Sequence, residues 1–94
     1  MKMKYDVQFT NQFKKDVKLA KKQGKDLEKL YTVIENLAEG KTLEAKHRDH
    51  SLSGNYKSCR ECHIEPDWLL IYEIIDDVLV LMLNRTGSHS ELFR

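Results

Sequence analysis

Residues 68–75, with the sequence WLLIYEII, form an almost unbroken apolar run in a chain of 94 residues. A strand in the middle of a sheet has such a run, because other parts of the chain cover both of its faces. The run therefore predicts a central strand, and the segments around it must supply its neighbours in the sheet and its cover.

Two further strand-like segments lie close to this run. Residues 56–65 precede it, and residues 78–83 return after a turn at Asp76 and Asp77. Links this short favour antiparallel hairpins, since a parallel connection needs a crossover of a dozen or more residues. The second half of the chain therefore predicts an antiparallel meander of three strands, followed by a helical turn over residues 88–93.

One strand and two helices are expected before residue 41. Tyr5, Val7 and Phe9 alternate with polar residues, which is the pattern of a half-buried strand. Apolar residues then recur at helical spacing on either side of Gly24, and Asp26 is placed to cap the second helix. They are Phe13, Val17 and Ala20 in the first helix and Leu27, Leu30, Tyr31, Ile34, Leu37 and Ala38 in the second.

The fold class that follows is α+β, a single domain over residues 1–94 with the order β-α-α-β-β-β. A two-helix hairpin packs on a mainly antiparallel four-stranded sheet, and residues 41–55 form a polar loop. The sequence has no run of eighteen apolar residues, and its first ten residues lack the apolar segment of a secretory signal. We therefore expect a cytoplasmic protein without a membrane partner.

The charges are unevenly distributed although the net charge is only +1. Residues 1–25 hold eight lysines against two aspartates, whereas residues 61–77 hold six acidic residues and no lysine or arginine. A basic helix face attracts polyanions such as RNA by releasing counterions, and the alternative is a face that is simply solvated. The candidate contacts on the first helix are Lys15, Lys18 and Lys22.

Cys59, Cys62 and His63 form the pattern C-x-x-C-H, which attaches c-type haem in some proteins. On a strand, residues three positions apart point to opposite faces, so the two thiols would not meet at one ligand. A zinc site would need two more ligands, for which the sequence offers histidines but no second C-x-x-C or H-x₃-H pattern. We therefore expect no metal and no cofactor.

All four histidines of the chain lie after residue 46. In the predicted meander the last strand runs parallel to the strand of His63, so Arg85 ends at the same rim of the sheet as His63, and His89 can fold back onto it. The candidate site residues are His50, His63, Asp67, Trp68, Arg85, His89 and Phe93.

This set of residues suits cleavage of an RNA phosphodiester, in which the 2′-hydroxyl of the RNA is the nucleophile. The reaction needs a base, an acid and a cation that stabilises charge on the phosphate, and it requires no metal. Histidine serves as base or acid near neutral pH, and arginine matches phosphate with a planar fork. Phe93 or Trp68 can stack on a base, although the alternative for each is packing in the core.

Four motifs cover nearly the whole chain: KDVKLAKK at 15–22, DHSLSG at 49–54, HIEPDWLLIY at 63–72, and RTGSH followed by Leu92 and Phe93 at 85–93. In this order they resemble the YafQ-type toxins of the RelE/ParE superfamily, which belong to bacterial type II toxin–antitoxin pairs. The resemblance implies two helices against an antiparallel sheet. It also implies a ribosome-dependent endoribonuclease that cuts mRNA in the ribosomal A site.

The resemblance further implies roles for the candidate residues. His89 would be the general acid, and His50 or His63 would lie beside the nucleophile together with Asp67. Arg85 would stabilise the scissile phosphate, Phe93 would position the nucleotide, and the lysines of the first helix would contact ribosomal RNA.

The implied partners are the 70S ribosome with its mRNA and a cognate antitoxin of the DinJ or RelB type. Such an antitoxin has a ribbon-helix-helix end, which would connect the toxin indirectly to operator DNA. Two alternatives remain open. One is a non-nuclease toxin of the same fold that poisons DNA gyrase, as in the ParE branch, and the other is an inactive RNA- or antitoxin-binding module.

Overall fold

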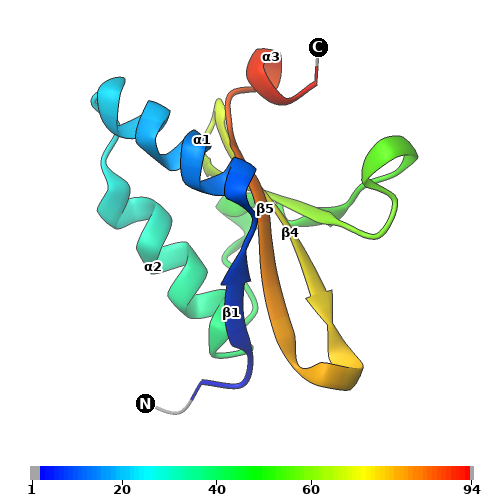
Figure 1. Ribbon diagram of the computed structural model, residues 1–94. Helices are drawn as coiled ribbons and strands as arrows, with labels where there is room; N and C mark the ends of the chain where they lie inside the picture. The colour runs from blue at the N-terminus through cyan, green and yellow to red at the C-terminus, as the bar shows by residue number, and fades with distance from the viewer. Residues whose placement is uncertain (1–2, 94) are drawn as a thin grey trace.

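The computed structural model describes residues 3–93. Figure 1 shows two helices stacked on one side of a twisted sheet, with a short helix above the sheet near the C-terminus. In the described part of the chain, every helix is too short or too polar to span a bilayer. The elements in chain order, with η for a 3₁₀ helix, are β1 (Asp6–Phe9), α1 (Asn11–Lys22), α2 (Leu27–Ala38), η1 (Ala45–His47), β2 (His50–Ser51), η2 (Gly54–Tyr56), β3 (Arg60–Glu65), β4 (Trp68–Ile75), η3 (Asp76–Val78), β5 (Val80–Gly87) and α3 (His89–Leu92).

The strands form one sheet in the order β1-β5-β4-β3-β2. The predicted meander is confirmed, because β4 pairs antiparallel with both β3 and β5. The sheet has five strands instead of the expected four, since His50 and Ser51 add a short edge strand beside β3. The sheet is mixed, because β1 pairs parallel to β5. The helical hairpin leads the chain from β1 at one edge of the sheet to β2 at the other edge, and the meander then returns to place β5 beside β1.

Each of the two long helices begins after a capping side chain, and that of the second helix, Asp26, is the one the sequence predicts. Thr10 caps α1 by accepting a hydrogen bond from the Phe13 N–H at 3.0 Å, and Asp26 caps α2 by accepting one from the Glu28 N–H at 3.1 Å. One predicted core position is wrong, because Tyr31 is exposed and Val33 is buried in its place on the inner face of α2. Phe9 was expected on the buried face of the first strand, but the residue is exposed (50%) at the sheet edge.

The central strand has a hydrophobic cluster on each face. Leu70 and Tyr72 point toward α1 and α2, whereas Leu69 and Ile71 point to the opposite face and pack with Cys59 and Leu92. The continuous apolar run of β4 is explained by this double cover. The small second cluster matters for the site, because it fixes α3 against the end of the sheet.

Candidate active site at the rim of the sheet

Several of the predicted site residues converge where β3 and β5 end and α3 begins, and we call this end of the sheet the rim. The ring centroids of His63 and His89 are 5.9 Å apart, and those of His89 and Phe93 are also 5.9 Å apart. His63 lies near the end of β3, and His89 is the first residue of α3. The parallel course of β3 and β5 thus brings together residues 26 positions apart, as the meander predicted.

A buried carboxylate lies between two of the histidines. Oε1 of Glu61 is 3.4 Å from Nε2 of His50 and 3.7 Å from Nε2 of His63. Glu61 is only 4% exposed, so water screens the interaction of its carboxylate with the two histidines only weakly. The sequence-based prediction missed this residue, although Glu61 and His63 are two positions apart on one strand and therefore share a face.

The two histidines that share Glu61 are fixed in the same tautomer. Nδ1 of His50 lies 2.6 Å from the carbonyl oxygen of Arg48, and Nδ1 of His63 lies 3.2 Å from that of Pro66. A carbonyl oxygen only accepts, so Nδ1 is the donor in each ring and Nε2 is the nitrogen that gains or loses a proton. Any proton held on either Nε2 would meet the same carboxylate oxygen of Glu61.

Asp67 belongs to a second histidine–carboxylate pair. Its Oδ1 accepts from the backbone N–H of His89 at 3.1 Å and lies 3.3 Å from Nδ1 of the same residue. The backbone hydrogen bond and then the ring hydrogen bond from His89 lower the pKa of Asp67, so this carboxylate stays ionised. The structure thus pairs Asp67 with His89, whereas the prediction placed it with His50 or His63 around the nucleophile.

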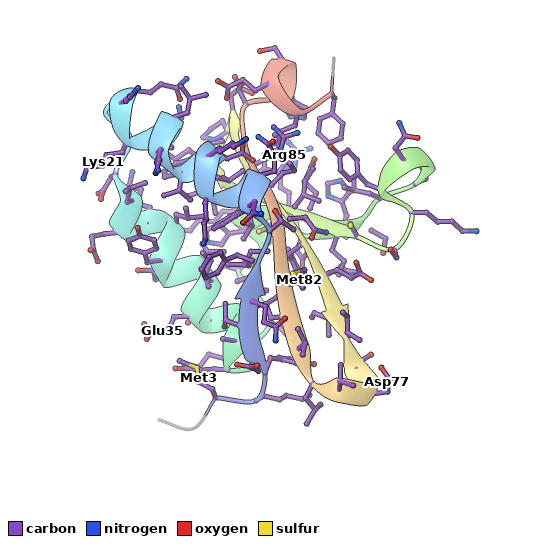
Figure 2. The ribbon with its side chains drawn as sticks, viewed as in Figure 1. Met3, Lys21, Glu35, Asp77, Met82 and Arg85 are labelled. Atoms are coloured by element: carbon purple, nitrogen blue, oxygen red, sulfur yellow. The ribbon has the colours of Figure 1, made fainter. Side chains whose placement is uncertain are left out.

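Arg85 is held from the opposite side by helix α1. Its Nε and Nη2 donate to the two carboxylate oxygens of Asp16 at 2.8 and 3.2 Å. Figure 2 shows Arg85 beside α1 where that helix crosses β5. The hydrogen bonds to Asp16 raise the pKa of Arg85 above its usual value, so the guanidinium stays charged. The prediction did not assign a role to Asp16, although it lies on the apolar face of the helix between Phe13 and Ala20.

Two aromatic residues meet at the open side of the rim. Phe93 is 41% exposed, and its ring contacts the Tyr56 ring edge-on with centroids 5.6 Å apart. Trp68 differs from the expectation that it could stack on a nucleotide, because it is 1% exposed. Its indole N–H donates to the hydroxyl of Thr86 at 3.0 Å, so Trp68 is a core anchor and the stacking interpretation is wrong.

The lysine-rich face of α1 is turned toward solvent. The helix turns Phe13, Asp16 and Ala20 toward the protein, so its lysines are on the outer side. The three candidates Lys15, Lys18 and Lys22 are all exposed. The structure brings His50, His63, His89, Asp67 and Phe93 together by direct contacts or through Glu61. Arg85 joins this group through Tyr56, which also contacts Phe93.

The two cysteines are free and buried on opposite faces of the sheet. The prediction that they do not face a common ligand is confirmed. Burial raises the pKa of both thiols, that of Cys62 to about 12, so neither is a ready nucleophile. Among residues 3–93, no three or more histidine, cysteine, aspartate or glutamate side chains are arranged to hold a metal ion.

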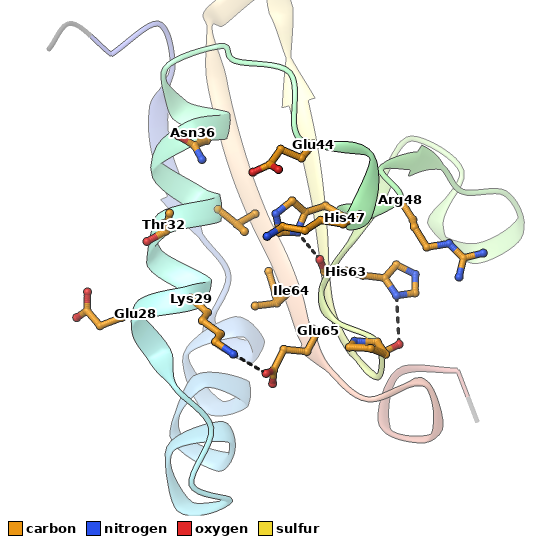
Figure 3. A pocket seen from close by; sticks show the side chains of 13 residues that line it. Glu28, Lys29, Thr32, Asn36, Glu44, His47, Arg48, His63, Ile64 and Glu65 are labelled. Atoms are coloured by element: carbon orange, nitrogen blue, oxygen red, sulfur yellow. Dashed lines mark hydrogen bonds and ion pairs between the residues drawn. The ribbon is translucent and has the colours of Figure 1, made fainter.

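A hollow of about 700 Å³ lies on the other side of β3, between α2 and the segment 44–48. Figure 3 shows Lys29 on α2 paired with Glu65 on β3, and the His47 ring bonded to the carbonyl of His63. Acidic and basic side chains are mixed along its walls. The hollow shares His63 with the rim, and it is also lined by Arg48 and Pro66, whose carbonyl groups hold the rings of His50 and His63. The two carboxylates paired with histidines at the rim, Glu61 and Asp67, do not line it.

Comparison with known proteins adds a family context to this geometry. The family described as "Bacterial toxin of type II toxin-antitoxin system, YafQ" matches residues 5–94. The mRNA interferase toxin YafQ of Escherichia coli strain K12 is 43% identical over 89 residues, which are 94% of this chain and 95% of that protein.

Two solved structures are similar over nearly their full length. The toxin chain in the crystal structure of the E. coli DinJ–YafQ toxin–antitoxin complex has a TM-score of 0.89 and 41% identity, covering 98% of this chain and 100% of that one. The crystal structure of a metal-bound toxin from Helicobacter pylori has a TM-score of 0.89 and 46% identity, covering 95% of this chain and 99% of that one.

Proposed function

The chain belongs to the YafQ family of bacterial type II toxin–antitoxin toxins, and from this premise we propose that it is an mRNA interferase that cuts mRNA in the ribosomal A site. The observation that carries the chemistry is the pair of histidine–carboxylate groups facing each other across the rim. His63 with Glu61 lies on one side, His89 with Asp67 lies on the other, and their rings are 5.9 Å apart. A phosphate group bound between the rings could be reached by both.

In the proposed reaction, Nε2 of His63 removes the proton of the 2′-hydroxyl, and the 2′-oxygen attacks the adjacent phosphorus. The bond from phosphorus to the 5′-oxygen breaks, and His89 gives its proton to that leaving oxygen. The products are a 2′,3′-cyclic phosphate and a free 5′-hydroxyl. His50 shares the carboxylate of Glu61 with His63. It would accept the 2′-hydroxyl proton instead of His63, or receive that proton from His63 after the attack.

The remaining rim residues supply charge and orientation. Arg85 carries a permanent positive charge that would stabilise the phosphate oxygens as negative charge develops on them. Phe93 and Tyr56 would stack on the base of the nucleotide being cut, since aromatic faces accept any base without hydrogen-bond readout.

The proposed cleavage uses no metal, because the histidines can supply the base and the acid and Arg85 can supply the positive charge. The H. pylori relative was solved as a metal-bound toxin, which is a property of that protein. Chelation tests whether a transition metal is needed, because EDTA binds such ions far more tightly than it binds Mg²⁺. Addition of EDTA to a purified reaction, with the ribosomal Mg²⁺ restored in excess, should leave the cleavage rate unchanged.

Two partners complete the proposal. Lys15, Lys18 and Lys22 form an exposed basic face that would contact ribosomal RNA phosphates in the cytoplasm. The E. coli relative is known in complex with the antitoxin DinJ, and we propose a cognate antitoxin of that type for this chain. Its ribbon-helix-helix end would carry the complex to operator DNA.

A cleavage map tests the proposed function. Purified protein is mixed with one defined mRNA, with and without programmed ribosomes, and the new 5′ ends are located. Cuts confined to the A-site codon in the presence of ribosomes are expected. Equal cutting of free RNA would contradict ribosome dependence, and no cutting by folded protein would favour a gyrase-directed toxin or an inactive binding module.

A further inference from the structure

The outer edge of β5 is completed by a helix instead of a strand. β1 pairs with β5 only as far as Leu83, so residues 84–87 have no strand on that side. The hydroxyl of Thr10 donates to the carbonyl oxygen of Asn84 at 2.8 Å, and Oδ2 of Asp16 accepts from the N–H of Thr86 at 3.1 Å. Two side chains of α1, from its cap Thr10 and from Asp16 in its middle, thus satisfy backbone groups that a neighbouring strand would otherwise bind.

Asp16 makes a second connection that Thr10 does not make. Its carboxylate, 7% exposed, accepts from Nε and Nη2 of Arg85 in a two-point fork. The same residue therefore fixes the backbone of β5 and the direction of the guanidinium beside it. A fork of this kind sets the plane of the guanidinium, because two of its nitrogens are bound at once.

We propose that Asp16 is a positioning residue for catalysis, holding Arg85 so that Nη1 and the remaining hydrogen of Nη2 point to the scissile phosphate. This inference rests on the proposed function, in which Arg85 stabilises charge on that phosphate. Preorganised donors are effective because they need not be reoriented during the reaction, and a displacement of about 1 Å can cost a large factor in rate. Asp16 would act through Arg85 and would not touch the RNA.

A purely structural role for Asp16 predicts different behaviour. If Asp16 only anchors α1 to the sheet, its loss should weaken folding and affect activity no more than the loss of Thr10 does. Thr10 is the matched control, because its hydroxyl bridges the same helix and strand without a contact to Arg85. The two residues therefore separate anchoring from positioning.

The test compares Asp16→Asn, Asp16→Glu and Thr10→Ala with the wild-type protein. The asparagine keeps an oxygen for the Thr86 N–H but loses the charge and one acceptor for Arg85. We expect Asp16→Asn to lower kcat on programmed ribosomes by about tenfold or more, with the KM for ribosomes nearly unchanged. Asp16→Glu should recover part of kcat, and Thr10→Ala should lower the melting temperature without a comparable loss of kcat.

A spectroscopic readout on the free protein makes the test independent of activity. The Nη2–H of Arg85 that donates to Oδ1 of Asp16 should exchange slowly with solvent in the wild type and in Thr10→Ala. It should exchange rapidly in Asp16→Asn, because the oxygen kept for the Thr86 N–H is the one that also accepts from Nε, and the amide nitrogen faces Nη2. Unchanged kcat in a folded Asp16→Asn would overturn the inference. So would a loss of kcat in Asp16→Asn and in Thr10→Ala that is proportional to the loss of melting temperature in each variant. If the wild type cut no RNA, the proposed function would fail, and a rapidly exchanging Arg85 Nη2–H in the wild type would separately exclude the hold by Asp16.

Discussion

Asp67 accepts two hydrogen bonds from His89, one from the backbone N–H at 3.1 Å and one from Nδ1 at 3.3 Å. Asp67 lies in the turn between β3 and β4, and His89 opens α3. One carboxylate therefore fixes both the start of the short helix and the orientation of the imidazole. The proposed general acid, His89, is therefore oriented by Asp67 through both its backbone and its ring.

Removal of this pair should separate catalysis from partner binding. His89→Ala should reduce mRNA cleavage to about 1% or less, because a positioned general acid contributes on the order of 10²–10⁴-fold. Asp67→Asn should cause a smaller loss, since the amide oxygen still accepts one hydrogen bond but the charge is gone. The measurement is single-turnover cleavage on programmed ribosomes, with capture of the antitoxin as the control. A fully active His89→Ala protein would show that the general acid is elsewhere.

Phe93 should contribute to substrate binding and little to stability. Its ring is partly exposed beside His89 and Tyr56, and loss of a stacked base contact costs about 1–3 kcal/mol. Phe93→Ala should therefore raise the KM for programmed ribosomes by roughly tenfold. Phe9→Ala is a matched control, since Phe9 is another half-exposed phenylalanine on the remote strand β1. Equal effects of the two substitutions would argue against stacking at Phe93.

The two cysteines should be dispensable for activity. Both are buried and their pKa values are raised, so the folded protein should react slowly with a thiol reagent at pH 7. The double variant Cys59→Ala with Cys62→Ala should keep its cleavage rate and lose about 1 kcal/mol of stability per site. Thiol titration and thermal unfolding check these outcomes. A folded double variant without activity would restore a metal or redox role for the thiols.

The short helix α3 should remain docked in mildly acidic solution. Hydrogen bonds from His89 lower the pKa of Asp67, and hydrogen bonds from Ser88 and Gln23 lower that of Glu91. A carboxylate whose pKa is lower in the folded state than in the unfolded state stabilises the fold at any pH above the unfolded-state pKa. That contribution is lost as the pH falls through the folded-state pKa. Backbone NMR signals of α3 should therefore persist at pH 5 and change only below about pH 4. Release of α3 above pH 5 would contradict these shifts.

Much of the fold could be predicted because local patterns specify it. The apolar run of β4, the short links around it and the caps at Thr10 and Asp26 act within a few residues. The parallel pairing of β1 with β5 and the short strand β2 depend on contacts between distant segments. Nothing in the local pattern distinguishes residues 50–51 from the polar loop around them, so β2 was not expected.

The candidate site could be predicted in part. The meander topology was sufficient to bring His63, Arg85 and His89 to one rim. The partners of these residues were harder to identify, because Asp16 and Glu61 lie in segments with many other charges. Only their positions on inward-facing sides distinguish them, Asp16 by helical spacing and Glu61 by strand alternation. Trp68 shows the opposite error, because the sequence placed it at the site, whereas its side chain is buried in the core and bonded to Thr86.

In the proposed reaction the nucleophile is the RNA's own 2′-hydroxyl, bound at the rim. The most direct measurement uses an mRNA with a single 2′-deoxynucleotide immediately 5′ of the cleaved bond, on programmed ribosomes with wild-type protein. We expect this message to remain intact, while the all-ribose message yields a fragment ending in a 2′,3′-cyclic phosphate. Cleavage of the deoxy-substituted message at the same bond would exclude attack by the 2′-hydroxyl, because water or another group would then be the nucleophile.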